Sequence, residues 1–209
     1  MTEASDVKKR ILEHSLQLFI QYGIRSVSMD DLASDVGISK KTIYQYYKDK
    51  NQLVEDAVAA ILNKNFCECE ETKVIAKNAI EESFMLVRQR DDFFNILNPL
   101  ILYDLKKYHP KGYGIFMEYK DNQLYNILKK NIEWGIADGL FREDINVKLT
   151  TIFRLETIEV AFLPEFQSKV NLNIKEIHRE LFYLFLNGIA TKKGHTLILK
   201  LKNKLNATV

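Results

Sequence analysis

Residues 28 to 50, SMDDLASDVGISKKTIYQYYKDK, form the segment that most restricts how this chain can fold. Ser28 is followed three residues later by Asp31, a spacing with capping-box character that supplies acceptors for the free N–H groups of a helix start. Apolar residues then recur at helical spacing until Gly37, which can adopt the left-handed conformation that ends a helix. Ser39 is suited to cap the next helix. The segment therefore predicts two short helices joined by a tight turn.

The second of these helices has one apolar face and one polar face. Ile43 and Tyr47 lie one turn apart, so we expect both to face a small core. At about 100° per residue, the opposite face presents Lys41, Thr42 and Gln45. Such side chains can bond to base edges in the major groove of DNA. The pattern predicts a helix-turn-helix that reads duplex DNA; the alternative is two surface helices joined by a glycine turn.

Neighbouring side chains extend the predicted DNA contacts. Lys40, Tyr44 and Tyr46 can reach phosphates on either side of the base contacts. Lys50 lies beside the N-terminus of the following helix, where backbone N–H groups also bind phosphate. Residues 39–50 hold four lysines and one aspartate, so the positive charge is local to this face. The predicted DNA-binding residues are Ser28, Ser39, Lys40, Lys41, Thr42, Tyr44, Gln45, Tyr46 and Lys50.

The N-terminal residues up to Leu53 resemble the DNA-binding domain of the tetracycline-repressor (TetR) family of regulators. The matching positions are Lys9-Arg10-Ile11-Leu12, Leu18-Phe19, Gly23, Val27-Ser28-Met29, Leu32-Ala33, Val36-Gly37-Ile38-Ser39, Thr42-Ile43-Tyr44, Tyr46-Tyr47-Lys48, Lys50 and Leu53. His14 and Ser15 depart from the small apolar residues usual in the family, and Tyr47 stands where Phe is more common. The resemblance implies a DNA-binding head, a helical effector-binding and dimerisation domain, and a role as a transcriptional regulator, more often a repressor than an activator.

Composition is that of an ordinary globular protein. The chain has 209 residues, of which 46% are hydrophobic and 28% charged, and this leaves room for one large or two modest domains. Its formal net charge of +2 does not by itself require a polyanionic partner. Neither a secretory signal nor the ~20-residue apolar run of a membrane span is evident. We therefore expect a cytoplasmic protein without membrane contact.

The sequence offers little for catalysis or metal binding. Cys67 and Cys69 lie two residues apart in a predicted helix and point to nearly opposite sides, so a disulfide between them is implausible. The four histidines are scattered, and no two have metal-ligand spacing on a helix. No nucleophile turn or phosphate loop is present. We predict no enzymatic activity, no cofactor and no metal site, and we interpret both cysteines as ordinary helix residues.

Helix breakers are few, since the chain has only three prolines and eight glycines. We expect an all-α fold of about nine helices. The predicted domains are a helix-turn-helix DNA-binding domain (1–51), a helical effector-binding and dimerisation domain (52–194) and a tail of unassigned structure (195–209). Outside the helix-turn-helix, helices are predicted over residues 7–22, 51–69, 74–90, 99–108, 113–138, 147–163 and 173–191.

The sequence also predicts where several helices begin and end. Asn98-Pro99 fits an N-cap followed by proline at the first helical position, and residues 109–112 (HPKG) predict a turn. Pro164 is expected to end the helix that precedes it. In the tail after Gly194, apolar and basic residues alternate; a strand, a helical extension and a basic arm are all compatible, and a solvated tail is favoured.

Homodimerisation is expected from two arguments. The family resemblance implies that the last two long helices pair with their copies in a four-helix bundle, where Gly188 lets backbones approach. Independently, one helix-turn-helix makes too few contacts for specific binding, whereas two copies can read a pseudo-palindromic operator. The predicted dimerisation residues are Phe153, Val160, Ile177, Leu181, Leu184, Phe185 and Gly188.

The resemblance also implies an unidentified small-molecule effector. Aromatic and sulfur-containing side chains are abundant between residues 84 and 153, which suits an apolar or aromatic effector, and ordinary helical core is the alternative interpretation. The candidate ligand residues are Phe84, Tyr103, Phe116, Trp134 and Phe153. A second hypothesis for the function is a DNA-binding protein of the same fold with a protein partner and no small-molecule effector.

Overall fold

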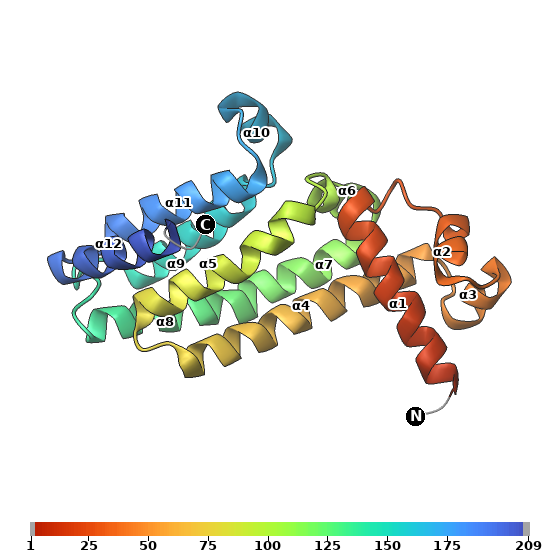
Figure 1. The fold of residues 1–209 in the computed structure, drawn as a ribbon, viewed down its shortest axis with the longest axis horizontal. Coiled ribbons are helices and arrows are strands. Elements are labelled where there is room, and N and C mark those ends of the chain that lie inside the picture. Colours follow the sequence, from red (N-terminus) through yellow and green to blue (C-terminus); the bar gives the residue numbers. More distant parts are fainter. Residues whose placement is uncertain (1–2, 207–209) are drawn as a thin grey trace. The chain divides into compact units, whose positions relative to one another are not determined.

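The computed structural model describes residues 3–206, and each regular element in that part of the chain is helical (Figure 1). The described chain packs as two compact units. Residues 3–65 and 96–119 belong to the first, and residues 66–95 and 120–206 belong to the second. None of the described helices is both long enough and apolar enough to cross a membrane. The predicted all-α fold is confirmed, and the functional division at residues 51 and 52 stays a prediction.

One long helix contributes to both units. It is α4 (Lys50–Ile75), whose residues up to Asn65 pack with the first unit. The first unit also contains α1 (Glu3–Tyr22), α2 (Met29–Val36), α3 (Lys40–Tyr46), α6 (Ile101–Tyr108) and α7 (Pro110–Glu118). The second also contains α5 (Ala79–Ile96, except its last residue), most of the π-helical turn η1 (Tyr119–Leu124), α8 (Tyr125–Ala137), α9 (Val147–Val160), α10 (Pro164–Val170), α11 (Ile174–Ile189) and α12 (Lys192–Asn206).

The first unit is built around the apolar faces of its N-terminal helices. Ile11 and Phe19 of α1, Leu32 of α2, Ile43 of α3 and Leu53 of α4 are all no more than 2% exposed. Buried positions recur at helical spacing, as at 11, 15 and 19 in α1 and at 29, 32, 33 and 36 in α2, so each of these helices buries one face in the core. Residues 96–119, which include α6 and α7, follow the first segment of the second unit in the sequence but belong to the first unit.

The start of α6 and α7 differs from the sequence prediction. Helix α6 begins at Ile101, and Asn98 Oδ1 accepts from the backbone N–H of Leu100 at 2.9 Å, so Asn98 orders the turn before the helix instead of capping its first residue. The turn predicted over 109–112 is wrong, because Pro110 is the first residue of α7. Proline suits that position, since it has no N–H to leave unsatisfied and its φ is already helical.

The core of the second unit joins α5, α11 and α12 to the turn after α8. Phe84, Phe182 and Leu186 are each no more than 5% exposed and pack with Phe141 and Ile198. The turn is held by backbone hydrogen bonds to the end of α11, including one from the Arg142 N–H to the Ile189 carbonyl at 2.8 Å. No cap was predicted at the start of α11, yet Asn173 forms a capping box there with Glu176. These bonds fix both ends of α11.

The C-terminal half contains two helices that the sequence did not predict. Helix α9 ends at Val160, and Pro164 begins the short α10 instead of simply ending a helix. The favoured solvated tail is wrong for the described part of the tail, which lies in α12, where Ile198 is 1% exposed in the core. The labelled helices therefore run to α12 and exceed the expected nine, while residues 207–209 lie outside the described residues.

The contact between Gly135 and Phe141 predicts a stability effect. A Cβ on Gly135 would lie 2.0 Å from Phe141 Cδ2, and the Phe141 ring is fully buried. We expect Gly135→Ala to lower the free energy of unfolding by about 1–3 kcal/mol through overpacking. Urea unfolding followed by circular dichroism measures the change.

The matched control is Gly114→Ala in α7, where no atom lies within 4 Å of the added Cβ. We expect this variant to gain about 0.5–1 kcal/mol, because alanine is favoured over glycine inside a helix. A Gly135→Ala protein as stable as the Gly114→Ala protein contradicts the packing described here.

Candidate nucleic-acid interface

The orientation of α3 is fixed by one buried face and two caps. The helix has seven residues, which is too few to be stable alone because isolated helices shorter than about 12 residues are marginal in water. Ser39 Oγ accepts from the Thr42 N–H at 3.0 Å, and the Tyr47 N–H donates to the Ile43 carbonyl at 3.0 Å. Ile43 and Tyr47 are 0% exposed, as their spacing predicts. The opposite face of α3 must therefore point to solvent.

Helix α2 and the turn after it are set by the predicted local signals. The Asp31 N–H donates to Ser28 Oγ at 3.1 Å, and the Ser28 N–H donates to Asp31 Oδ2 at 2.8 Å, which completes the capping box. Hydrogen bonds from the Ser28 side chain and backbone lower the pKa of Asp31. Gly37 has φ 73° and ends the helix in the left-handed conformation. The two short helices and tight turn predicted from the sequence are confirmed.

The outward face of α3 carries unpaired polar groups. Lys41 and Gln45 are exposed, and in the described part of the chain their side chains have no hydrogen-bond or ion-pair partner. Tyr44 is exposed, with 45% of its surface accessible, whereas Tyr46 is less accessible and half-buried. Thr42 is half-buried, and its hydroxyl is 2.8 Å from Ser39 Oγ. The geometry thus leaves Lys41, Tyr44 and Gln45 free to meet a ligand.

Lys40 lies beside this face and already has an anionic neighbour. Its ammonium donates to Asp30 Oδ2 of α2 at 2.8 Å, and this hydrogen bond raises the pKa of Lys40. Both side chains are exposed, and exposed ion pairs are weak, so a phosphate can compete with Asp30 for the ammonium. The predicted phosphate contact of Lys40 is compatible with this arrangement.

Lys50 has a different environment from the one expected. Its ammonium donates to the carbonyl oxygens of Ile24 and Val27 and lies 5.8 Å from the centre of the Phe19 ring. Burial lowers the pKa of Lys50, and Asp104 and Asp31 oppose that effect. The side chain therefore ties the α1–α2 connection to the start of α4. We correct the direct phosphate contact predicted for Lys50 to a positioning role.

The sequence did not indicate a second tie between the same connection and α6. The Arg25 N–H donates to Asp104 Oδ2 at 3.0 Å, and Asp104 is only 6% exposed. The Arg25 guanidinium also donates to the Tyr108 hydroxyl at 3.2 Å and lies 5.1 Å from that ring's centre. Arg25 and Asp104 lie 79 positions apart, so no local pattern could have paired them. Together with the Lys50 bonds, this tie holds the connection between α1 and α2 in place.

The predicted dimerisation residues occupy three environments on α9 and α11. Phe153 and Leu184 are 57% and 70% exposed, and nothing lies within 4 Å of a Cβ added to Gly188. Val160, Leu181 and Phe185 are half-buried. Ile177 is 2% exposed and belongs to the interior of the second unit, so its assignment to a contact surface is wrong. Two further exposed apolar residues on α9, Leu149 and Ile152, were not in the predicted set.

The five predicted ligand residues do not form one group. Tyr103 and Phe116 belong to the first unit, and Tyr103 is 46% exposed. Phe84 lies in the core of the second unit, where Trp134 packs against the same core. Phe153 is an exposed residue of α9. These positions agree better with ordinary core and surface roles than with a shared cavity.

A polar groove lies within the first unit. It has a volume of about 460 Å³ and is lined by the start of α4 and the start of α7, including Asn51, His109 and Lys111. His109 Nδ1 is 2.7 Å from Asn51 Oδ1, and burial lowers the pKa of His109. None of the predicted ligand residues lines this groove.

The known proteins to which this chain is similar are described as transcriptional regulators. Residues 11–57 match the family described as bacterial regulatory proteins, tetR family. The chain is similar to the uncharacterized HTH-type transcriptional regulator YvaF of Bacillus subtilis (strain 168), with 30% identity over 190 residues that cover 87% of this chain and 94% of that protein. It is also similar to the HTH-type transcriptional repressor KstR2 of Mycolicibacterium smegmatis, with 21% identity over 196 residues that cover 90% and 92%.

The fold is shared with a solved structure. A transcriptional regulator from Saccharomonospora viridis, crystallised in complex with choline, superposes with a TM-score of 0.75. The superposition covers 90% of this chain and 100% of that one, and the sequences are 19% identical. This likeness concerns the fold alone.

Substitution of Lys50 distinguishes a positioning role from a direct phosphate contact. We expect Lys50→Met to lower the free energy of unfolding by about 1–3 kcal/mol, because the Ile24 and Val27 carbonyls lose their donor. The slope of log K for DNA binding against log salt should stay unchanged. A slope smaller by about 1 would instead indicate a lost phosphate contact.

Lys48→Met serves as the control, since the Lys48 side chain is exposed and has no partner in the described range 3–206. Its free energy of unfolding should remain within about 0.5 kcal/mol of the wild-type value. Denaturant unfolding and fluorescence anisotropy on labelled duplex DNA supply both readouts.

Proposed function

Because the chain belongs to the TetR family of bacterial transcriptional regulators, we propose that it binds a pseudo-palindromic operator as a homodimer, represses transcription there, and is released by a small apolar or aromatic effector. It is a DNA-binding regulator, and its relatives are regulators and not enzymes. The observation that carries the proposal is the outward face of α3, which presents unpaired polar side chains while its inner face is fully buried.

Base and phosphate contacts are divided along α3. Lys41 and Gln45 can each present hydrogen-bonding groups to base edges in the major groove, and lysine and glutamine favour guanine and adenine respectively. Tyr44 and Lys40 lie where they can bind the phosphates that flank those bases. Ser28 and Ser39 cap the starts of α2 and α3, and their own hydroxyls are occupied by those caps, so their proposed role is to position the first-turn N–H groups that can donate to a phosphate.

The homodimer is supported by exposed apolar side chains on two helices that pack together. Leu149, Ile152 and Phe153 on α9 are 65%, 40% and 57% exposed, and Leu184 on α11 is 70% exposed. Exposed apolar side chains gathered on one surface are typical of interaction sites. A two-fold axis through this surface would bring α9 and α11 of two copies into a four-helix bundle. Each copy would then place its α3 in one half-site, with half-sites about 34–36 Å apart.

Effector release is supported by the layout of the chain. Helix α4 belongs to both units and carries at its first residue Lys50, which holds the α1–α2 connection. A ligand in the second unit that favours one position of α4 changes the separation of the two α3 helices. DNA fixes the separation it can accept, so such a ligand weakens binding by a coupling free energy of about 1–3 kcal/mol.

Base reading by α3 is tested by selecting binding sites from random duplex DNA with the purified protein. We expect a pseudo-palindromic site for the wild type. Lys41→Ala and Gln45→Ala should relax the preference at one base pair of each half-site by about 1–3 kcal/mol.

Lys48→Ala is the control variant and should keep the wild-type base preference at every position. Unchanged preferences in the Lys41 and Gln45 variants would contradict the assignment of the reading face. Selection without enrichment of any site would contradict the operator itself.

The dimer surface gives a separate expectation. Leu184→Glu should weaken dimerisation at least tenfold, because it places a charge in an apolar interface, while the folded monomer is retained since Leu184 is 70% exposed. Ile75→Glu, at a position 67% exposed at the end of α4, is the control and should leave the dimer intact. Sedimentation equilibrium measures both. Equal dimerisation of the two variants would place the interface elsewhere.

A further inference from the structure

The interior of the second unit holds a guanidinium without a carboxylate partner in the described part of the chain. Arg154 of α9 is 4% exposed. Its Nη2 lies 3.4 Å from His178 Nε2 of α11, and its Nη1 has no hydrogen-bond partner there. The rings of Phe182 and Phe185 lie 5.6 and 5.5 Å from the guanidinium carbon. Burial lowers the pKa of Arg154 to about 10.

The bond to Arg154 defines the proton position on His178. Arginine can only donate, so Nε2 must accept, and a neutral imidazole then carries its proton on Nδ1. Burial, and next the charge of Arg154, lower the pKa of His178 to about 3, so the ring is neutral at pH 7. His178 is 4% exposed, and its Nδ1 has no partner within the described residues. Both unpartnered atoms of this pair are therefore donors that need an acceptor.

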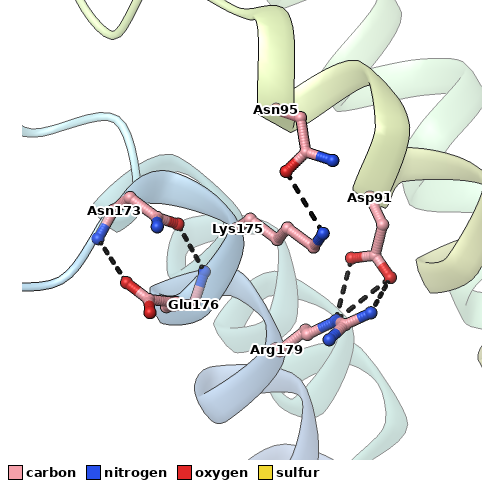
Figure 2. Close-up of polar contacts among 6 residues, drawn as sticks. All are labelled: Asp91, Asn95, Asn173, Lys175, Glu176 and Arg179. Atoms are coloured by element: carbon pink, nitrogen blue, oxygen red, sulfur yellow. Dashed lines mark hydrogen bonds and ion pairs between the residues drawn. The ribbon is translucent and has the colours of Figure 1, made fainter. Parts of the chain in front are cut away.

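Carboxylates on α5 and α9 are engaged by other cations. Asp91 of α5 accepts from Arg179 Nε with both oxygens at 3.0 Å, as Figure 2 shows beside the bond from Lys175 to Asn95. On α9, Glu156 and Glu159 both pair with the Lys120 ammonium. These carboxylates are thus paired with other cations, and Arg154 has no counter-ion among the described residues. The contrast with Arg179 on the adjacent helix is direct, because that guanidinium is 42% exposed and still has a carboxylate.

An uncompensated buried cation is costly. Taking an ion out of water carries a desolvation penalty, and cation–π attraction to aromatic faces offsets only part of it. A cluster of this kind at a helix pair is a candidate functional site by the same reasoning that links perturbed ionisable groups to function. The missing partner must be an acceptor, and it must carry negative charge to match one guanidinium.

Aromatic rings connect the pair with the surface of the second unit. Phe94 of α5 lies 4.9 Å from the His178 ring, and Phe162 lies 6.0 Å from Phe94. Phe162 and Phe185 are half-buried, whereas Phe94 is 9% exposed. An anion that reaches Arg154 along these rings must have an apolar body.

We propose that Arg154 and His178 bind the carboxylate of a hydrophobic monocarboxylic acid, one oxygen accepting from Arg154 Nη1 and the other from His178 Nδ1. The apolar body of the acid lies among Phe94, Phe162 and Phe185. A single carboxylate matches the single positive charge of the pair, and the rings exclude strongly hydrated anions such as phosphate. This inference rests on the proposed function, because it names the chemical class of the effector.

The test measures acid binding by the full-length protein without DNA. Isothermal titration calorimetry at pH 7 uses octanoate and benzoate, with octanamide and benzamide as neutral probes of the same shape. We expect the wild type to bind at least one acid and to bind its amide at least tenfold more weakly. Arg154→Met should lose at least tenfold in affinity for that acid.

Two variants keep the test interpretable. Arg154→Met should melt at the wild-type temperature or above, since replacing an uncompensated buried ion by an apolar side chain of similar volume is neutral or stabilising. Lys148→Met removes an exposed cation from the same helix and should bind the acid as the wild type does. Nitrogen-15 NMR should show neutral His178 protonated at Nδ1.

The proposal is overturned if neither acid binds at millimolar concentration, if acid and amide bind equally, if Arg154→Met binds like the wild type, or if His178 is protonated at Nε2. Adding the bound acid to an operator complex separates this result from the proposed function. Acid that binds through Arg154 without changing operator affinity supports the site and contradicts effector release. Operator binding without acid binding supports the regulator and contradicts the site.

Discussion

Burial of Ile43 and Tyr47 under α3 is the constraint on which the DNA-binding face depends. A seven-residue helix is not stable in isolation, so the orientation of α3 is determined by the residues that pack against its inner face. Because both side chains are fully buried, rotation of α3 would expose them, and the outward direction of Lys41 and Gln45 is fixed as a consequence. Packing of the inner face of α3 therefore sets the direction of the outer face that we propose binds DNA.

The buried charges of this protein differ in whether they have an internal partner. In the first unit, Lys50 donates to two backbone carbonyls and Asp104 accepts from the Arg25 N–H, and these bonds hold the connection between α1 and α2. In the second unit, the Lys120 ammonium pairs with Glu156 and Glu159, whereas Arg154 is buried without a counter-ion in the described chain. The proposed effector would supply the acceptor that Arg154 lacks, in a chain whose α4 helix is part of both units.

Local signals explain what the sequence could predict. Ser28, Gly37 and Ser39 act on bonds within four residues, so the helix-turn-helix and its exposed face followed from the printed sequence. Tertiary partners explain what it could not. The sequence predicted Lys50 as a phosphate ligand, but in the structure its ammonium donates to carbonyl groups 23 and 26 positions away. The burial of Ile177 likewise depends on helix packing, because an apolar stripe does not reveal which copy of the chain covers it.

The central claim is that two copies of α3 read DNA together from one fixed face. Hydroxyl-radical footprinting of the wild-type protein on its selected site measures this most directly. The account predicts two symmetrical protected segments on the same side of the duplex, about one helical turn of 10 to 10.5 base pairs apart or a multiple of it. A single protected segment, or two segments on opposite sides of the duplex, would contradict it.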